Sequence, residues 1–368
     1  MKKIPVFNRV FDNDDLKYIK TVIKNNWISS NGQFTNKFEN KFSNLINHKY
    51  VSMVSSGTSA LECALAALNL KKGDEVILPN FTIISCLNTI LKFEAKPVIL
   101  DVCKETWLIQ IEKILHAINS KTKAILIVNI FGNPFNVKEL KSKLKNKKIT
   151  IIEDCAESLC SYNNGNISGS VSDISIFSLF SNKLITSGEG GVVCTTNKNY
   201  IKRINNYKNL FFGKKERFNH SEIGYNYRLS DLQAAMAYSS FLKIKKNIKN
   251  INRVGNLYKK YLSKNHRIIF QKENDNSKKL WWMYPIIFKN INNNIEKIRN
   301  HLLKNHIDTR NLFKPLDTMS FIKKIKYKTY GNKNSMFLYK NGLYLPSSYL
   351  LKENQIKYIS NVINEYIS

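Results

Sequence analysis

The sequence predicts an α/β protein in two units, a large one built on a mostly parallel sheet and a smaller α+β one. Its 368 residues exceed the roughly 250–300 residues that a single hydrophobic core serves. In the first two thirds of the chain, short apolar runs alternate with stretches of helical periodicity. The runs are almost continuously apolar, which is typical of strands that helices cover on both faces.

Six of these apolar runs are predicted to be strands of the large sheet. In chain order they are residues 75–79, 97–101, 124–128, 149–153, 173–178 and 191–195. A helix is predicted over residues 59–70, because its leucines and alanines follow helical spacing. This alternation of strands and helices is typical of parallel βα units.

The boundary between the two units is placed near residue 245. A helical pattern runs over residues 228–248 and ends in a stretch rich in Lys and Asn. The segments beyond it are predicted to form a strand and two helices, at residues 281–288, 295–304 and 352–367. We therefore expect a large domain over residues 14–245 and a small domain over residues 246–368, with residues 1–13 packing on the small one.

The charge of the chain is strongly positive, with 58 Lys and Arg against 27 Asp and Glu, a formal net charge of +31. Such a charge could indicate a nucleic-acid partner. However, 50 of the 58 cations are Lys, whereas readers of phosphates and base edges rely on Arg, whose planar fork binds bidentately. A compositional bias spread over a solvated surface explains the charge better, so we expect no nucleic-acid partner.

Several other classes of protein are excluded. The fractions of apolar (43%) and charged (23%) residues exclude a disordered, collagen-like or disulfide-stapled chain. No apolar run approaches the ~18–20 residues that span a bilayer, and the start lacks the apolar core of a secretory signal. The six cysteines show neither CxxC pairs nor metal-ligand spacing. We expect a cytoplasmic protein with reduced thiols, no membrane partner and no metal.

Two segments suggest ligand groups, one at the start of a helix and one at the carboxyl end of a strand. Residues 55–60 (Ser-Ser-Gly-Thr-Ser-Ala) begin the first predicted helix, where free N–H groups and the helix dipole favour an anion; the alternative is an ordinary N-cap. Asp154 ends a buried strand, where open α/β sheets place ligand groups. It could keep a cationic nitrogen protonated, or it could be a solvated strand end.

Two further segments suggest a nucleophile and a second anion contact. Lys183 lies between a strand end and the Gly-rich turn 186–191. Desolvation there would lower its pKa and make it a nucleophilic amine suited to a Schiff base, although most of the 50 lysines are expected to be surface groups. Residues 224–228 (Gly-Tyr-Asn-Tyr-Arg) could donate to an anion or form a packed corner.

In this order and at these separations, the four segments resemble the sugar aminotransferases of the DegT/DnrJ/StrS family, which are pyridoxal-phosphate enzymes. The resemblance covers nearly the whole chain, because it extends to residues 4–6, 29–32, 73–79, 308–310 and 343–347. It implies the type I fold of pyridoxal-phosphate transferases, which resembles aspartate aminotransferase.

The resemblance implies pyridoxal 5'-phosphate as the cofactor and Lys183 as the catalytic residue that forms a Schiff base with it. Asp154 would pair with the ring nitrogen, so that the ring accepts electrons. Glu157 would lie near the cofactor hydroxyl. Ile83 stands where relatives usually carry an aromatic residue; it could pack on the ring, with the stacking lost or supplied by another residue.

The resemblance also implies a phosphate site and a partner subunit. Thr58, Ser59 and Ser178 would hold the cofactor phosphate at the helix start. Asn226 would reach the phosphate of the neighbouring subunit's cofactor, which implies a homodimer with shared active sites.

By the same resemblance, the chain is expected to move an amino group from glutamate to a keto group of a nucleotide-linked 6-deoxy sugar, in surface-polysaccharide biosynthesis. The expected position is C4 of a GDP-linked sugar, as in the perosamine-forming branch; the alternatives are C3 and a UDP-linked sugar. A few members carry His in place of the Schiff-base Lys and act as dehydratases, but Lys183 is present here. The alternatives outside enzymology are a cofactor-binding regulator and a basic nucleic-acid-binding protein.

Overall fold

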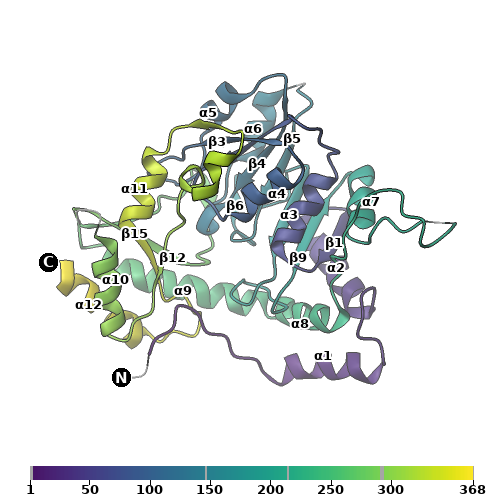
Figure 1. The fold of residues 1–368 in the computed structure, drawn as a ribbon. Helices are drawn as coiled ribbons and strands as arrows, with labels where there is room; N and C mark the ends of the chain where they lie inside the picture. The colour runs from purple at the N-terminus through teal and green to yellow at the C-terminus, as the bar shows by residue number, and fades with distance from the viewer. Residues whose placement is uncertain (1–2, 146, 214, 291–293, 368) are drawn as a thin grey trace.

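The large sheet determines the architecture of the chain (Figure 1). The computed structural model describes residues 3–145, 147–213, 215–290 and 294–367. Within these ranges, one sheet has eight strands in the order β1-β9-β8-β5-β4-β2-β3-β14. In chain order they are β1 (Tyr50–Val54), β2 (Glu75–Pro79), β3 (Lys96–Leu100), β4 (Thr122–Val128), β5 (Thr150–Asp154), β8 (Ile174–Ser178), β9 (Gly191–Thr195) and β14 (Lys328–Tyr330).

The pairing of these strands confirms the predicted α/β class. Every neighbouring pair is parallel except the two that involve β9, which runs antiparallel to β1 and to β8. Each of the six predicted strands lies in this sheet, with bounds within two residues of the prediction. The edge strands β1 and β14 were not predicted.

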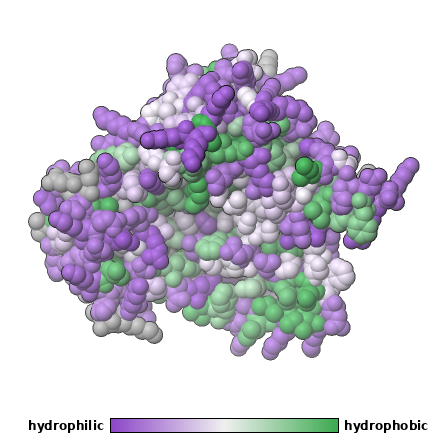
Figure 2. Space-filling model, in the orientation of Figure 1, coloured by the Kyte–Doolittle hydropathy of each residue, from purple (hydrophilic) through white to green (hydrophobic). Residues whose placement is uncertain are grey.

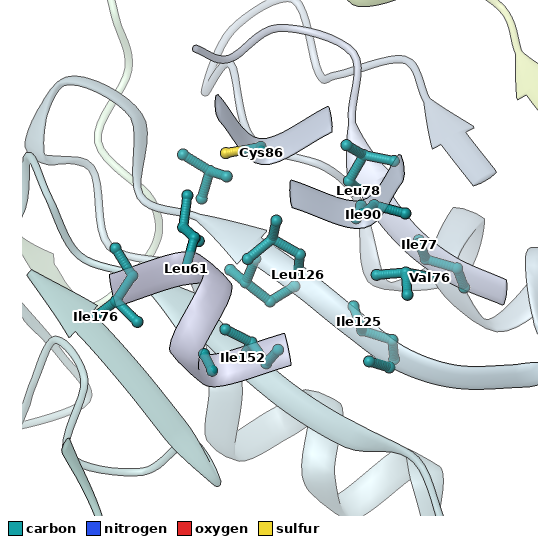
Figure 3. Close-up of a cluster of buried hydrophobic side chains, with 14 of the residues drawn as sticks. Leu61, Val76, Ile77, Leu78, Cys86, Ile90, Ile125, Leu126, Ile152 and Ile176 are labelled. Carbon is teal, nitrogen blue, oxygen red and sulfur yellow. The ribbon is translucent and has the colours of Figure 1, made fainter. Parts of the chain in front are cut away.

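Helices pack on the strands of the large sheet and bury its apolar side chains. The helices before residue 245 are α1 (Asn13–Lys24), α2 (Gln33–Ile46), α3 (Gly57–Ala66), α4 (Ser85–Lys92), α5 (Ile111–Ala117), α6 (Val137–Leu144), α7 (Lys198–Tyr207) and α8 (Asp231–Leu242), followed by α9 (Ile244–Leu262). Figure 3 shows Leu61 of α3 beside Leu126, Ile152 and Ile176 of three adjacent strands. This packing holds α3 against β8 and β9. At the start of α3, a Cβ atom on Gly57 would lie 3.3 Å from the Cβ of Ser178, the last residue of β8.

A second, antiparallel sheet lies beside the large one. Its order is β10-β12-β15-β13. Its strands are β10 (Ile268–Phe270), β12 (Tyr284–Phe288), β13 (Arg310–Asn311) and β15 (Gly342–Leu345). The helices of this part are α10 (Ile295–Lys304), α11 (Lys333–Asn341) and α12 (Glu353–Ile367). A small ribbon of β6 (Tyr162–Asn163), β7 (Asn166–Ile167) and β11 (Ser277–Lys278) joins the two parts.

The two parts are interwoven, so the domain limits near residue 245 stay a prediction. Helix α9 begins at Ile244, next to the predicted limit, but β14 joins the large sheet from the last third of the chain. The N-terminal segment contacts the smaller part, because the Ile4 amide donates to the His306 carbonyl (2.8 Å) and the Ser347 amide to the Val6 carbonyl (2.7 Å). From there the segment runs to α1, which packs on α8 (Figure 1). Residues 1–2, 146, 214, 291–293 and 368 lie outside the described residues.

Two further findings concern the whole described chain. The six cysteines are free thiols. Among the described residues, no helix has both the length and the hydropathy that crossing a membrane requires.

Candidate active site

A cavity of about 360 Å³ opens where the carboxyl ends of β5 and β8 meet the start of α3. Asp154 is the last residue of β5, and Ser178 is the last residue of β8. Loops that follow these strands bring Glu157 and Lys183 to the same cavity. Parallel strands that end at one edge of a sheet gather polar groups in this way.

The start of α3 forms one end of the cavity. Ser56 caps the helix, and its side chain and that of Ser59 form a reciprocal capping box. Ser59 therefore has a structural role: its hydroxyl donates to the Ser56 carbonyl (2.8 Å) and accepts from the Ser56 amide (2.8 Å). In the described part of the chain, the amides of Gly57 and Thr58 have no hydrogen-bond partner. This end is suited to an anion.

A glycine makes the close approach of β9 to this helix start possible. A Cβ atom on Gly191 would lie 2.3 Å from the carbonyl oxygen of Ser56. Any side chain at position 191 would push the cap away from the strand. The Gly-rich turn of the sequence thus positions the anion end of the cavity.

Asp154 supplies a buried carboxylate. Its Oδ1 accepts from the Ala156 amide (3.0 Å) and its Oδ2 from the Cys86 thiol (3.5 Å). Burial raises the pKa of Asp154, and the charge of Lys183 opposes this. A cationic nitrogen beside Asp154 would favour its ionised form.

Glu157 supplies a second buried carboxylate. Its Oε2 accepts from the Phe131 amide at 2.7 Å. Burial raises the pKa of Glu157 to about 7, against the opposing charge of Lys183. Glu157 is therefore able to change its protonation state near neutral pH.

Lys183 carries the amine of the cavity. Its amide donates to the Phe180 carbonyl (2.9 Å), which closes a turn after β8. The side chain is partly buried, and burial of the amine lowers the pKa of Lys183 in spite of Glu157 and Asp154. Its Nζ lies 3.5 Å from the centroid of the Trp282 ring. A lowered pKa provides the neutral amine that attacks a carbonyl.

The structure brings most, but not all, of the predicted site residues together. The predicted residues that line the cavity are Thr58, Ile83, Asp154, Glu157, Ser178 and Lys183. The Thr58 hydroxyl contacts the Ser85 hydroxyl (2.9 Å), and Ile83 is 44% exposed. Ser59 and Asn226 do not line it: Asn226 is exposed and forms an isolated β-bridge with Asn209. The roles of these residues stay predictions.

Sequence reasoning missed three aromatic residues that close the cavity. Trp282, Phe313 and Tyr344 come from the part of the chain that holds the smaller sheet. Tyr344 lies within the segment 343–347, and the Trp281-Trp282 pair was read only as the start of a strand. The strand begins at Tyr284, so Trp282 is in the preceding loop.

The assembled cavity suits a ligand with three features. An anionic group fits the start of α3, a cationic ring nitrogen fits Asp154, and a carbonyl group fits the amine of Lys183. Comparison with known proteins agrees with this arrangement. The model of the DegT/DnrJ/EryC1/StrS aminotransferase family matches residues 10–364.

Two relatives and one solved structure are similar over the full length. The GDP-perosamine synthase of Escherichia coli O157:H7 is 35% identical over 368 residues, 100% of both chains, and that of Vibrio cholerae is 31% identical over 365 residues, 99% of both. A GDP-4-keto-6-deoxymannose-3-dehydratase, crystallised with a trapped PLP-glutamate geminal diamine, has a TM-score of 0.91 at 24% identity. The match covers 98% of this chain and 99% of that one, and it establishes the fold alone.

Proposed function

Because this chain belongs to the DegT/DnrJ/EryC1/StrS aminotransferase family, we propose that it is a pyridoxal-phosphate-dependent aminotransferase of a GDP-linked sugar. It moves the amino group of glutamate to the C4 keto group of a GDP-linked 4-keto-6-deoxy sugar. The observation that carries the chemistry is the buried amine of Lys183, which shares one cavity with the carboxylates of Asp154 and Glu157. The full-length similarity to two GDP-perosamine synthases supports the choice of sugar.

The residues of the cavity fit pyridoxal 5'-phosphate. The unpartnered amides of Gly57 and Thr58, with the Ser178 hydroxyl beside them, would hold the phosphate. Asp154 would hold the ring nitrogen, and Glu157 would lie near the ring hydroxyl. When bound, the cofactor supplies an aldehyde carbon and a ring that accepts electrons.

The side chains of the protein position the reactants and move protons. Lys183 would supply the amine that bonds the cofactor's aldehyde carbon and would move the proton to and from the reacting carbon; burial lowers its pKa, which favours the neutral amine. Asp154 would be held in its ionised form by the charge of the ring nitrogen. Glu157 accepts a hydrogen bond from the Phe131 amide. Its pKa of about 7 allows it to exchange a proton near neutral pH.

The proposal includes a homodimer that shares its active sites. Asn226 is exposed and does not reach the cavity of its own chain, which agrees with a role in the cavity of a partner. Large apolar side chains are exposed on and around α1, where Figure 2 shows a hydrophobic area at the lower right. They are Val10, Phe11, Leu16, Ile23, Trp27 and Ile28. Covering them would bury apolar surface that is costly to leave in water.

The place of the reaction follows from its substrate. A 4-keto-6-deoxy sugar nucleotide must come from a dehydratase that acts on a nucleotide sugar, a step we place in the cytoplasm. The amino sugar nucleotide would then be a donor for a surface polysaccharide such as an O-antigen.

Product analysis tests the proposal directly. The protein, loaded with cofactor, is incubated with glutamate and either GDP-4-keto-6-deoxymannose or UDP-4-keto-6-deoxyglucose, and the products are identified by mass spectrometry and NMR. We expect a 4-amino sugar from the GDP substrate and little product from the UDP substrate. A 3-amino product, or a preference for the UDP substrate, would replace the proposed specificity. Failure to turn over any keto sugar would reject the enzymatic function.

A further inference from the structure

The aromatic ring of Trp282 lines the cavity and is held in place by its neighbours. Its side chain is 9% exposed, although it lies in the loop before β12. Its indole Nε1 donates to the Asn182 carbonyl at 3.0 Å. The ring also stacks on Phe131, with centroids 6.3 Å apart and planes 22° from parallel. These two contacts hold the ring in one orientation.

The amine of Lys183 rests on the face of this ring. Its Nζ lies 3.5 Å from the ring centroid, well within the ~6 Å range of cation–π attraction. Within the described residues, the amine makes no hydrogen bond and no ion pair. The indole face attracts the ammonium form and accepts a weak N–H contact from the neutral form, but it cannot take the proton as a carboxylate does.

The contacts of Trp282 join the two reactive loops. On one side, the indole N–H donates a hydrogen bond to the backbone carbonyl of Asn182, the residue before Lys183. On the other side it stacks on Phe131, whose amide donates to Glu157 at 2.7 Å. The position of the ring is thus set by the loop that carries the amine and by the turn that binds the second carboxylate.

We propose that Trp282 is a positioning residue: it holds the amine of Lys183 during the part of the cycle in which that amine is not bonded to the cofactor. This inference rests on the proposed function, in which Lys183 leaves the cofactor and returns to it in every cycle. A free lysine side chain has many rotamers, and holding its amine at one place shortens the return. The ring face holds the amine without consuming its lone pair in a hydrogen bond.

Other charged groups also act on this amine. Asp154 and Glu157 raise the pKa of Lys183 against the effect of burial. Glu189 and Tyr344 line the same cavity, and the charge of Lys279 acts on Glu157. A test must therefore change the ring and leave these groups in place.

The first test measures the Lys183 amine in cofactor-free full-length protein. The variants are Trp282→Leu, Trp282→Phe and, as a matched control, Trp281→Phe. Trp281 is the adjacent buried tryptophan, which faces Lys279 (4.2 Å) and Lys259 (4.7 Å) and does not line the cavity. Each protein is treated briefly with an amine-acylating reagent at a series of pH values, and labelling of Lys183 is read by peptide mass spectrometry.

Removal of the ring should move the midpoint of labelling to lower pH. The indole face favours the charged amine, so Trp282→Leu should lower the midpoint by about one pH unit. Trp282→Phe keeps a weaker aromatic face and should lower it less, and Trp281→Phe should leave it unchanged. An unchanged or raised midpoint in both Trp282 variants would overturn the inference. If the Leu variant does not fold, the comparison of the two Phe variants decides.

The second test follows the return of the amine to the cofactor. Cofactor is mixed with each cofactor-free protein, and the rate at which Lys183 forms its covalent bond with the cofactor is measured from the change in absorbance. We expect Trp282→Leu to slow this step about tenfold at saturating cofactor and Trp281→Phe to leave it unchanged. Equal rates in all variants would contradict the inference. Neither test uses a sugar, so loss of the proposed sugar specificity and loss of this inference give different results.

Discussion

Two lysines with lowered pKa values face two adjacent tryptophans, and one of the two lysines lies in the candidate active site. Lys183 lies over Trp282, and both line the cavity; Lys279 lies over Trp281, and neither lines it. Burial lowers the pKa of both, that of Lys279 to about 7. A buried lysine with a perturbed pKa is therefore not sufficient to identify a catalytic amine in this chain.

The two amines differ in their partners. The Lys279 amine donates to the Gln271 side-chain oxygen, and its amide donates to Glu273 at 3.4 Å. Among the described residues the amine of Lys183 makes no hydrogen bond: it lies over an aromatic ring, feels the charges of Glu157 and Asp154, and lines a cavity of about 360 Å³. A satisfied hydrogen bond makes Lys279 structural, whereas an available lone pair beside a ligand-sized space makes Lys183 reactive.

The largest expected effect is the difference in the rate of amino transfer between a variant of Lys183 and a variant of Lys279. Lys183→Ala removes the amine that, in the proposed mechanism, bonds the cofactor and moves the proton, so we expect amino transfer to fall by about 10⁴-fold or more. Lys279→Met keeps the size of a side chain that touches no reactant, so its rate should stay close to wild type. Steady-state rates of amino transfer measure both. Comparable losses in the two variants would break the distinction.

The next effect tests Asp154, the carboxylate that we propose pairs with the cofactor ring. Asp154→Asn keeps the shape and the bond from the Ala156 amide but removes the charge that holds a protonated ring nitrogen. We expect the rate of amino transfer to fall by about 10²–10³-fold, with cofactor still bound. Single-turnover absorbance with glutamate provides the measurement, and Asp173→Asn, far from the cavity, is the control. A wild-type rate in Asp154→Asn would remove Asp154 from the mechanism.

The smallest effect concerns stability at the structural lysine. In the unfolded chain the pKa of Lys279 is near its usual value of 10.5, and in the folded chain it is about 7. Between these two pH values the unfolded chain therefore binds more protons than the folded chain. The contribution of Lys279 to the free energy of unfolding should therefore rise with pH in this window. Relative to Lys279→Met, wild type should gain about 2 kcal/mol between pH 7 and pH 9.

Denaturant unfolding of the two proteins at several pH values checks this prediction. The difference between the curves isolates Lys279, because the remaining titratable groups are the same in both proteins. A difference that is constant with pH would show that the amine of Lys279 does not titrate in this range.

Local sequence pattern predicted the central strands and the chain-local part of the site. Apolar runs identified the six strands; Asp154 is the last residue of β5, and Lys183 lies in the loop that follows β8. The pattern missed β14, a polar edge strand of three residues whose position depends on docking against β3. It also predicted one helix over 228–248, where the chain forms α8 and α9 with Lys243 between them.

The remainder of the site depends on contacts between distant segments. Trp282 lies about a hundred residues from Lys183 in the sequence, and nothing in its own loop indicates where its ring faces. Ser59 fits the anion-binding pattern, but its hydroxyl is used in the capping box. Sequence pattern finds groups at strand ends; the fold decides which of them face the ligand.

The central claim is that, of 50 lysines, Lys183 bonds the cofactor. The most direct test reduces the cofactor-loaded protein with borohydride, digests it and locates the fixed cofactor by peptide mass spectrometry. The account predicts one labelled peptide that carries the cofactor on Lys183. Label on Lys279, label spread over surface lysines, or no label at all would contradict it.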